Sequence, residues 1–263
     1  MRTKAGEIVF LQERLDKIEE LLLIEGKVLV RDLSEQFKVS ESMIRKDLQM
    51  LEKQGRLKRT YGGAISIRPL VHDQGVNTRM HHDLDKKELI AKRAIPFINE
   101  GEVIFLDISS TNFALAKQLA KLNKRLTIVT NMIEIPPLFS ANIFVEVIMV
   151  GGQYNATLGG MIGALANEQI AMCKFDKSFI GVGGINVDEN FISNFNAEES
   201  ITKKTIIKSS KEVFVLIENE KFNRDGSYQF ATLQDITHLM TDAKLEGRIK
   251  EKLEQTGLNI SCG

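Results

Sequence analysis

The sequence predicts an α/β fold in two domains, a small N-terminal winged helix-turn-helix and a larger C-terminal domain with a Rossmann-like, mostly parallel sheet. Residues 40–64 have the pattern of a capped helix followed by a tight hairpin. From residue 103 onward, short apolar runs alternate with amphipathic stretches, as in repeated βα units. A length of 263 residues also suits two domains. We therefore expect domains over 1–68 and 86–263, joined by a polar linker over 69–85.

The N-terminal domain is expected to begin with an amphipathic helix that ends near Gly26. Its apolar residues recur at helical spacing and are Leu11, Leu15, Ile18 and Leu22. Residues 28–30 can form a short strand, and Leu33 and Phe37 belong to a second short helix. Residues 38–39 then turn the chain into a third helix.

The third helix carries the strongest local signals. The Ser40 hydroxyl can accept a hydrogen bond from a backbone N–H group of the first turn, and Glu41 adds negative charge at the positive end of the helix dipole. One apolar stripe is formed by Ile44, Leu48 and Leu51. Gly55 is placed to end the helix in the left-handed conformation.

The remaining faces of the third helix are free to touch an external partner. They carry Ser42, Arg45, Lys46 and Gln49. A basic hairpin follows, with residues 57–60 against 64–67 and Gly62-Gly63 as its turn. The net charge of the chain is zero, yet residues 40–68 contain seven basic and three acidic side chains. A cationic helix face followed by a basic hairpin is typical of a winged helix-turn-helix that reads DNA.

The second domain is predicted from five buried strands and the stretches between them. The strands cover 103–106, 126–129, 145–150, 179–182 and 213–217, with edge strands at 239–240 and 258–260 and a helix over 114–122. Such alternation favours a mostly parallel sheet with helices on both faces. Ligands of that architecture bind beyond the carboxyl ends of the strands.

Residues suited to one anionic ligand follow these strand ends. Hydroxyl and free N–H groups at a helix start form a phosphate cradle, and paired glycines let a ligand approach the backbone. In chain order the residues are Asp107, Ser109, Ser110, Thr111, Asn112, Thr130, Asn131, Gly151, Gly152, Gly183, Gly184 and Lys221. A helix cap or a turn explains any one of them alone, but their recurrence at successive strand ends predicts a pocket.

Cysteine and histidine usage predicts neither a disulfide framework nor a metal site, and no motif indicates a cofactor. Cys173 and Cys262 lie far apart in sequence. His72, His81 and His82 stand in a polar stretch without cysteine partners, and we expect them to be solvated. The sequence has no signal-peptide pattern and no apolar run as long as a membrane span. We therefore expect a cytoplasmic protein without a membrane partner.

The N-terminal motifs resemble the DNA-binding half of the DeoR family of bacterial transcription regulators, in which S-x-x-T-I-R-R-D-L is followed by L-x-x-x-G and H-G-G-A. The matching residues are Ser40, Ile44, Arg45, Asp47, Leu48, Leu51, Gly55, Gly62, Gly63 and Ala64. Met43, Lys46 and Tyr61 replace the usual threonine, arginine and histidine, which predicts an unusual operator sequence. The resemblance implies DNA contacts by Ser40, Ser42, Met43, Arg45, Lys46, Gln49, Arg59 and Tyr61.

The strand-end residues extend the resemblance over most of the chain. The sensor half of the DeoR family is similar to ribose-5-phosphate isomerase and CoA-transferase folds and binds phosphorylated sugars. Its motifs D-x-G-[ST]-T, T-N, G-G and D-x-[ST]-K-F correspond to residues 107–111, 130–131, 151–152 and 218–222. Arg79 and Lys87 match basic positions ahead of the first strand, and Glu198 lies in a matching acidic-then-basic helix. The resemblance thus adds Arg79, Lys87 and Glu198 to the strand-end residues as effector-binding positions.

Two departures from the family pattern affect the expected pocket. Ser109 replaces a glycine and narrows the backbone freedom of the phosphate loop. Glu218 and Glu220 replace an aspartate and a small hydroxyl residue around Lys221. These glutamates either favour a less anionic or differently shaped sugar phosphate, or pair with Lys221 and Arg224 on the loop.

The leading hypothesis is a sugar-phosphate-responsive transcription regulator, most often a repressor in this family, that binds double-stranded operator DNA as a dimer or larger homo-oligomer. The alternative is a sugar-phosphate isomerase-like enzyme with a DNA-binding appendage, in which Asp107, Glu198 and Lys221 would transfer protons. A third hypothesis is a structural protein that coats DNA without binding a small ligand.

Overall fold

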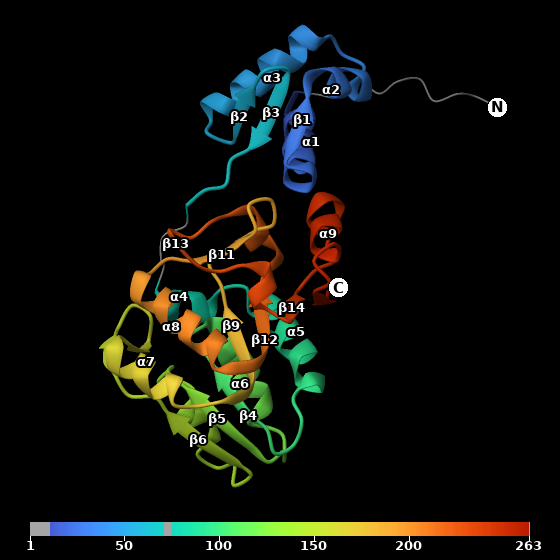
Figure 1. Cartoon of the computed structure of the whole chain (residues 1–263). Helices are drawn as coiled ribbons and strands as arrows, with labels where there is room; N and C mark the ends of the chain where they lie inside the picture. Colours follow the sequence, from blue (N-terminus) through green and yellow to red (C-terminus); the bar gives the residue numbers. More distant parts are fainter. Residues whose placement is uncertain (1–10, 71–74, 263) are drawn as a thin grey trace, which may run out of the picture. The chain divides into compact units, whose positions relative to one another are not determined.

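The structure, a computed structural model, describes residues 11–70 and 75–262 (Figure 1). The chain divides into two compact units. The first ends at Arg68 and also includes Glu246–Glu251, and the second contains Pro69–Leu245 and the residues from Lys252 onward. His72, which we expected to be solvated, falls outside the described residues.

The N-terminal unit is a winged helix-turn-helix, as the sequence predicts. Its elements are α1 (Leu11–Glu25), β1 (Lys27–Leu29), α2 (Val30–Phe37), α3 (Glu41–Lys53), β2 (Leu57–Thr60) and β3 (Gly63–Ser66). The three strands form an antiparallel sheet in the order β1-β3-β2. The apolar stripes of the three helices meet in one buried cluster, which contains Ile18, Leu33 and Ile44.

Helix α3 begins and ends where its sequence predicts. The Ser40 hydroxyl accepts a hydrogen bond from the Met43 N–H group at 3.3 Å. At the other end Gly55 has φ +71°, the left-handed conformation that a glycine adopts without strain.

The turn of the wing lies one residue earlier than predicted. Thr60 pairs with Gly63, so Tyr61 and Gly62 form the two-residue loop and Gly63 belongs to β3. A Cβ atom on residue 63 would lie 2.0 Å from the Val28 carbonyl oxygen of the neighbouring strand. Gly63 is therefore required by the close approach of β1, whereas Gly62, at φ +80°, supplies the turn.

A buried ion pair joins α1 to α3 inside the unit. The Arg14 guanidinium donates to both carboxylate oxygens of Asp47, at 2.6 and 3.1 Å. Both side chains are almost fully buried, and the hydrogen bonds that Arg14 donates to Asp47 raise the pKa of Arg14. Asp47, which matched the DNA-binding motif, thus holds the helices together and does not face outward.

The predicted linker over 69–85 is folded from Gly75 onward. It contains α4 (Val76–His81) and leads into α5 (Leu84–Ala94). Val76 is 2% exposed and packs in the core of the second unit, which explains why this polar stretch is ordered. His81 and His82 are exposed, as expected.

The C-terminal unit is built on a seven-stranded sheet in which every pairing is parallel. Its strands are β4 (Val103–Leu106), β5 (Leu126–Thr130), β6 (Val145–Met149), β9 (Phe175–Gly181), β12 (Ser210–Ile217), β14 (His238–Thr241) and β15 (Asn259–Ser261). Their order is β15-β14-β12-β9-β4-β5-β6. The chain runs outward from β4 to β6 and then returns to β9 on the other side of β4. The crevice between the carboxyl ends of β4 and β9 is therefore the switch point where ligands bind in such sheets.

Helices cover both faces of this sheet (Figure 1). The longer helices of this unit are α5, α6 (Ser110–Leu119), α7 (Ala164–Ala171) and α8 (Ala197–Lys208). A further helix, α9 (Gly247–Glu254), is divided between the two compact units. Ile104 and Leu106 of β4 pack with α5 and α6 in the main core. Phe105 points to the opposite face because side chains alternate along a strand, and there its ring lies 5.1 Å from that of Phe175. Helix α8 packs against β9 and β12.

The remaining elements are short and lie between the sheet strands. They are the hairpin β7 (Gln153–Asn155) and β8 (Gly160–Ile162), the antiparallel sheet of β10 (Gly184–Asn186), β11 (Phe191–Asn194) and β13 (Tyr228–Ala231), and the 3-10 helices Ile95–Phe97, Pro136–Phe139, Asn219–Asn223 and Leu233–Asp235. Helix α6 starts at Ser110, four residues before the predicted start, because the Ser109 hydroxyl caps it by accepting from the Asn112 N–H group at 3.1 Å.

The Arg14–Asp47 pair gives a prediction about stability. Asp47→Asn leaves a buried guanidinium without its counter-charge, which should lower the unfolding free energy of the N-terminal unit by about 3–5 kcal/mol. Hydrogen exchange of the α1 and α3 amides reports this free energy. Asp16→Asn, which changes an exposed carboxylate of α1, is the control and should have little effect. A loss below about 1 kcal/mol in Asp47→Asn would contradict the role of the pair.

Candidate functional site: an exposed helix face and a sensor cleft

The eight residues predicted to contact DNA are all exposed on α3 and the wing. They are Ser40, Ser42, Met43, Arg45, Lys46, Gln49, Arg59 and Tyr61. Met43 is 44% exposed, and Tyr61, at the tip of the wing, is fully exposed. A hollow between α3 and the hairpin is lined by Arg45, Arg59 and Tyr61 among others. Helix face and wing thus present one continuous polar surface.

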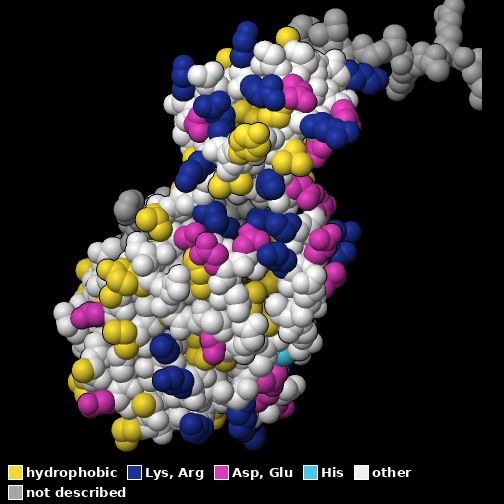
Figure 2. Space-filling model, turned by 45° about the horizontal axis from the view of Figure 1, so that its top comes forward, with side chains coloured by type: hydrophobic (Ala, Val, Ile, Leu, Met, Phe, Trp, Pro, Cys, Tyr) yellow, Lys and Arg dark blue, Asp and Glu magenta, His cyan; other side chains and the backbone are white. Residues whose placement is uncertain are grey.

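Two arginines of this surface are paired with carboxylates. The Arg45 guanidinium contacts Glu41 one turn earlier at 2.6 Å, and the Arg59 guanidinium contacts Glu52 at 2.6 Å. Lys and Arg side chains over the N-terminal unit are interspersed with acidic and hydrophobic ones (Figure 2). Exposed pairs of this kind contribute at most about 1 kcal/mol, so a DNA phosphate or a base edge can replace the carboxylate.

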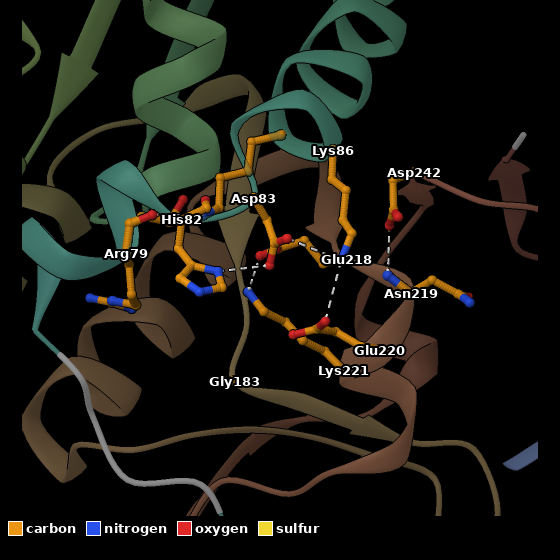
Figure 3. Close-up of polar contacts among 12 residues, drawn as sticks. Arg79, His82, Asp83, Lys86, Gly183, Glu218, Asn219, Glu220, Lys221 and Asp242 are labelled. Carbon is orange, nitrogen blue, oxygen red and sulfur yellow. Dashed lines mark hydrogen bonds and ion pairs between the residues drawn. The ribbon is translucent and has the colours of Figure 1, made fainter. Parts of the chain in front are cut away.

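The second candidate site is a cleft of about 170 Å³ in the C-terminal unit, here called the outer cleft. It lies where α4 and α5 meet the loop after β12 (Figure 3). Its lining residues are Arg79, His82, Asp83, Lys87, Ser110, Phe195, Glu218, Glu220, Lys221 and Arg224. Four cationic side chains and three carboxylates therefore face one small space.

The cations and carboxylates of the outer cleft form pairs across it (Figure 3). Lys221 contacts Glu218 at 2.9 Å, and Glu220 contacts Arg224 at 3.6 Å and Lys86 at 3.4 Å. Burial lowers the pKa of Lys221 despite the attraction of Glu218. Burial opposes ionisation of Glu218, but Lys221 outweighs it, and the pKa of Glu218 is lowered. The sequence left two alternatives for these glutamates. The structure shows the second, in which Glu218 pairs with Lys221 and Glu220 pairs with Arg224.

Lys87 holds the corner between α4 and α5 at the edge of the outer cleft. Its ammonium donates to the Arg79 carbonyl at 2.6 Å and to the His82 carbonyl. The side chain is buried, and this burial lowers the pKa of Lys87. Lys87 therefore fixes the backbone that carries Arg79, and it also lines the cleft.

A much smaller hollow of about 10 Å³, here called the inner chamber, adjoins the outer cleft. Arg79, Ser110 and Lys221 line both. The other lining residues of the inner chamber are Ile108, Ser109, Thr111, Gly181, Val182, Asn194, Glu199 and Lys203. The loop 109–111, predicted as a phosphate cradle, thus faces a space too small for a phosphoryl group, and the outer cleft has the larger volume.

The walls of the inner chamber are fixed by a buried ion network. Lys203 contacts Asp107 and, at 3.2 Å, Glu199. Burial disfavours the charged form of Lys203, but the two carboxylates together outweigh it and raise the pKa of Lys203. Burial raises the pKa of Glu199 in spite of Lys203.

Asp107 and Asn112 lie behind the chamber as part of its framework. Asp107 accepts from the Gly181 N–H group at 3.1 Å and from the Asn112 amide at 2.6 Å. The Asn112 amide also donates to the Phe179 carbonyl at 2.7 Å. These predicted ligand residues therefore join β4 to β9 and do not line either hollow.

The sequence predicted Glu198 as an effector-binding residue, but the adjacent Glu199 lines the inner chamber. Asn196 caps α8 by accepting from the Glu199 N–H group at 3.0 Å, and this phase turns Glu199 and Lys203 inward and leaves Glu198 exposed. Asp107, Glu198 and Lys221, the proposed proton-transfer set, therefore do not share a cavity among the described residues.

The residues after β5 and β6 are also absent from the lining of both hollows. The Thr130 hydroxyl donates to the Leu106 carbonyl, and the Asn131 amide donates to the Met161 carbonyl. The Gly151 N–H group donates to Gln169, and a Cβ on Gly152 would lie 2.8 Å from the Ile162 carbonyl oxygen. Thr130 thus ties β5 to β4, and the other three residues pack against β8 and α7.

The glycines after β9 serve close packing within the protein. A Cβ on Gly183 would meet the Phe195 ring at 2.9 Å, and one on Gly184 would lie 2.0 Å from the Arg224 carbonyl oxygen. The sequence predicted that a ligand approaches the backbone at these glycines. In the structure, protein atoms occupy the space beside them.

The sequence prediction missed several lining residues, namely His82, Asp83, Asn194, Phe195, Glu199, Lys203 and Arg224. The i, i+4 spacing of Glu199 and Lys203 was a usable signal, since it places both on one helix face.

Asp83, Glu218 and Glu220 bring carboxylate oxygens within 4.8 Å of one another, but each carboxylate is paired with a cation or a histidine. In the described part of the chain, no helix is long and apolar enough to span a membrane. The two cysteines form no disulfide.

Comparisons with known proteins agree with both halves of this arrangement. Residues 14–69 match the DeoR-like helix-turn-helix domain, and residues 82–243 match the DeoR C terminal sensor domain.

Curated relatives match nearly the whole chain. The HTH-type transcriptional regulator GolR of Listeria innocua is 32% identical, with 94% of this chain and 97% of the relative covered. The glycerol-3-phosphate regulon repressor of Escherichia coli is 30% identical, with 88% and 90% covered. The transcriptional repressor GlcR of Bacillus subtilis is 29% identical, with 96% of each covered.

Solved structures with lower similarity include ribose 5-phosphate isomerase A from Neisseria gonorrhoeae, 15% identical with a TM-score of 0.38 over 51% of this chain and 52% of the isomerase. The tetrameric eIF2B-beta2-delta2 complex from C. thermophilum is 14% identical with a TM-score of 0.47, over 65% of this chain and 60% of the matched chain. With both of its domains matched and its relatives aligned almost end to end, the chain belongs to the DeoR family of transcriptional regulators.

Proposed function

We propose that this protein is a repressor of carbohydrate metabolism genes whose binding to operator DNA is controlled by a phosphorylated sugar or a related intermediate. The observation that carries the proposal is the outer cleft, which adjoins the inner chamber at the switch point of the sheet and is lined by Arg79, Lys87, Lys221 and Arg224. Its cations suit a phosphoryl group, and its volume suits a small metabolite. Relatives named for glycerol 3-phosphate and for the lactose phosphotransferase system support the same class of signal.

In this proposal the phosphoryl group replaces the carboxylates that pair with the cations of the cleft. It takes over Lys221 from Glu218 and Arg224 from Glu220. The named proton-transfer set of the isomerase alternative does not meet around this cleft, because Lys221 lines it and Asp107 and Glu198 do not.

Control of DNA binding follows from a population shift between two states of the regulator. The ligand moves this equilibrium only by its differential affinity for the states, typically about 1–3 kcal/mol of coupling. We propose a homo-oligomer, since one small helix-turn-helix makes too few contacts for operator specificity. Paired half-sites one helical turn apart, or multiples of it, then follow.

The exposed guanidinium of Arg45 gives a prediction about sequence reading. Arg45→Ala should weaken binding to the specific operator by about 1–3 kcal/mol, as expected for loss of a contact to a guanine edge. The operator is selected from a random DNA pool, and affinities for it and for scrambled DNA are measured at one salt concentration. Lys17→Ala, which removes an exposed ion pair of α1, is the control. An equal loss on both DNAs would make Arg45 a phosphate contact.

Lys221 gives a prediction about effector response. Lys221→Met should weaken release of operator DNA by the sugar phosphate about tenfold or more, because a charge-assisted contact is lost. DNA affinity without effector should be unchanged. Lys211→Met, which removes an exposed lysine of the same unit, should respond as the unaltered protein does. Normal release in Lys221→Met would remove this residue from the binding site.

The lowered pKa of Lys221 predicts a specific pH dependence. Affinity for a phosphate monoester should rise as the ester loses its second proton near pH 6. It should fall again on the alkaline side, as Lys221 loses its proton at a pH below the ordinary lysine range. Calorimetric titration across this range measures both limbs. Lys221→Arg should remove the alkaline fall, and its persistence there would assign that limb to another group.

A further inference from the structure

Two residues that line the inner chamber each have a buried polar atom without a hydrogen-bond partner within the described residues. The atoms are Oε2 of Glu199 and Nδ2 of Asn194. Each residue is 2% exposed. A buried donor or acceptor without a partner is costly, so two such residues around one space require an explanation.

The two atoms have complementary hydrogen-bonding capacity. A carboxylate oxygen accepts, and an amide nitrogen donates. A hydroxyl group satisfies both at once, because its O–H donates and its oxygen accepts. The chamber volume of about 10 Å³ admits one group of roughly the size of a water molecule. A carboxylate or a phosphoryl group is too large for it.

Both signs of charge surround the chamber. Oε1 of Glu199 contacts Lys203, whose ammonium is shared with Asp107. Arg79 and Lys221 also line the chamber, so the choice of its occupant rests on size and on hydrogen bonding.

The inner chamber and the outer cleft are neighbours. Arg79, Ser110 and Lys221 line both, so a ligand that spans the two hollows would contact these side chains throughout. The larger outer space with four cations takes the phosphoryl end. The small inner space takes the opposite end.

We propose that the effector is held with its phosphoryl group in the outer cleft and a terminal hydroxyl in the inner chamber, where the hydroxyl donates to Glu199 and accepts from Asn194. This inference rests on the proposed function and narrows its ligand class. The effector is a phosphate monoester of a polyhydroxy chain that ends in a neutral hydroxyl. Esters with a carboxylate or a second phosphoryl group at that end are excluded by the size of the chamber.

The test compares phosphate esters that differ in their far end, in two chain lengths. The three-carbon probes are glycerol 3-phosphate, propyl phosphate and 3-phosphoglycerate. The six-carbon probes are glucitol 6-phosphate, hexyl phosphate and 6-phosphogluconate. Calorimetric titration of the full chain should show the hydroxyl-ended ester binding about tenfold tighter than both others in at least one set, since the others leave the two buried atoms unpaired. If neither set shows this order, the inference is wrong.

The same experiment separates the inference from the proposed function. Binding of any of the six esters without preference for the hydroxyl end leaves a phosphate-ester site but overturns the hydroxyl contact. No binding by any of the six overturns both the site and the contact.

Variants test the two residues directly. Glu199→Gln puts an amide where the ligand hydroxyl needs an acceptor, and Asn194→Ala removes the donor. Each should reduce the preference for the hydroxyl-ended ester about tenfold, with binding of the alkyl phosphate retained. Glu198→Gln alters the neighbouring exposed carboxylate of the same helix and should leave the preference intact. An unchanged preference in both Glu199→Gln and Asn194→Ala would overturn the inference, and the wild-type series decides it if a variant fails to fold.

Discussion

The buried contact of Lys203 with Asp107 and Glu199 is the constraint on which the ligand-facing edge of the sheet depends. Asp107 follows β4, its carboxylate accepts from the N–H group of Gly181 at the end of β9, and the lysine comes from α8. One network thus ties two strands and a helix at the switch point. Because these charges are fully buried, removal of any one of them leaves another without its counter-charge. The same network holds Glu199 and Lys203 in place around the inner chamber.

The outer cleft is organised differently, with cations that are already neutralised by carboxylates. Such pairing keeps the ligand-free protein stable, since buried lysines such as Lys221 would otherwise lack a counter-charge. It also means that an incoming anion gains only the difference between its own contacts and those of Glu218 and Glu220. For the proposed sensor, this competition favours a moderate affinity for the effector, and DNA binding then responds over a range of effector concentrations.

Most of the fold was predictable because its signals are local. Apolar runs identified every strand of the parallel sheet, and the capping serine and terminal glycine fixed the limits of α3. Strand β9 begins at Phe175, four residues before the predicted start at 179, because polar residues interrupt its first half. Helix α4 was missed because its sequence is polar and a single residue, Val76, anchors it in the core. That anchoring depends on a tertiary contact, which local patterns do not contain.

The candidate site was only partly predictable for the same reason. Arg79, Lys87, Ser110 and Lys221 were placed correctly around the hollows. Glu198 was chosen in place of Glu199 because the helix phase depends on the Asn196 cap. Gly183 and Gly184 were interpreted as ligand contacts, although neighbouring protein atoms occupy the space beside them. Motifs identify which residues are constrained, but only the structure tells whether a ligand or the protein itself imposes the constraint.

The corner between α4 and α5 links ligand chemistry to backbone geometry. Asp83 has φ +50°, a left-handed conformation that is strained for a residue other than glycine, and the Lys87 ammonium braces the same turn through two carbonyl groups. Both side chains also face the outer cleft. An anion that draws the Lys87 ammonium toward itself competes with these two carbonyl groups for the same donor. In the proposed sensor, occupancy of the cleft and the geometry of the bend between α4 and α5 are therefore coupled.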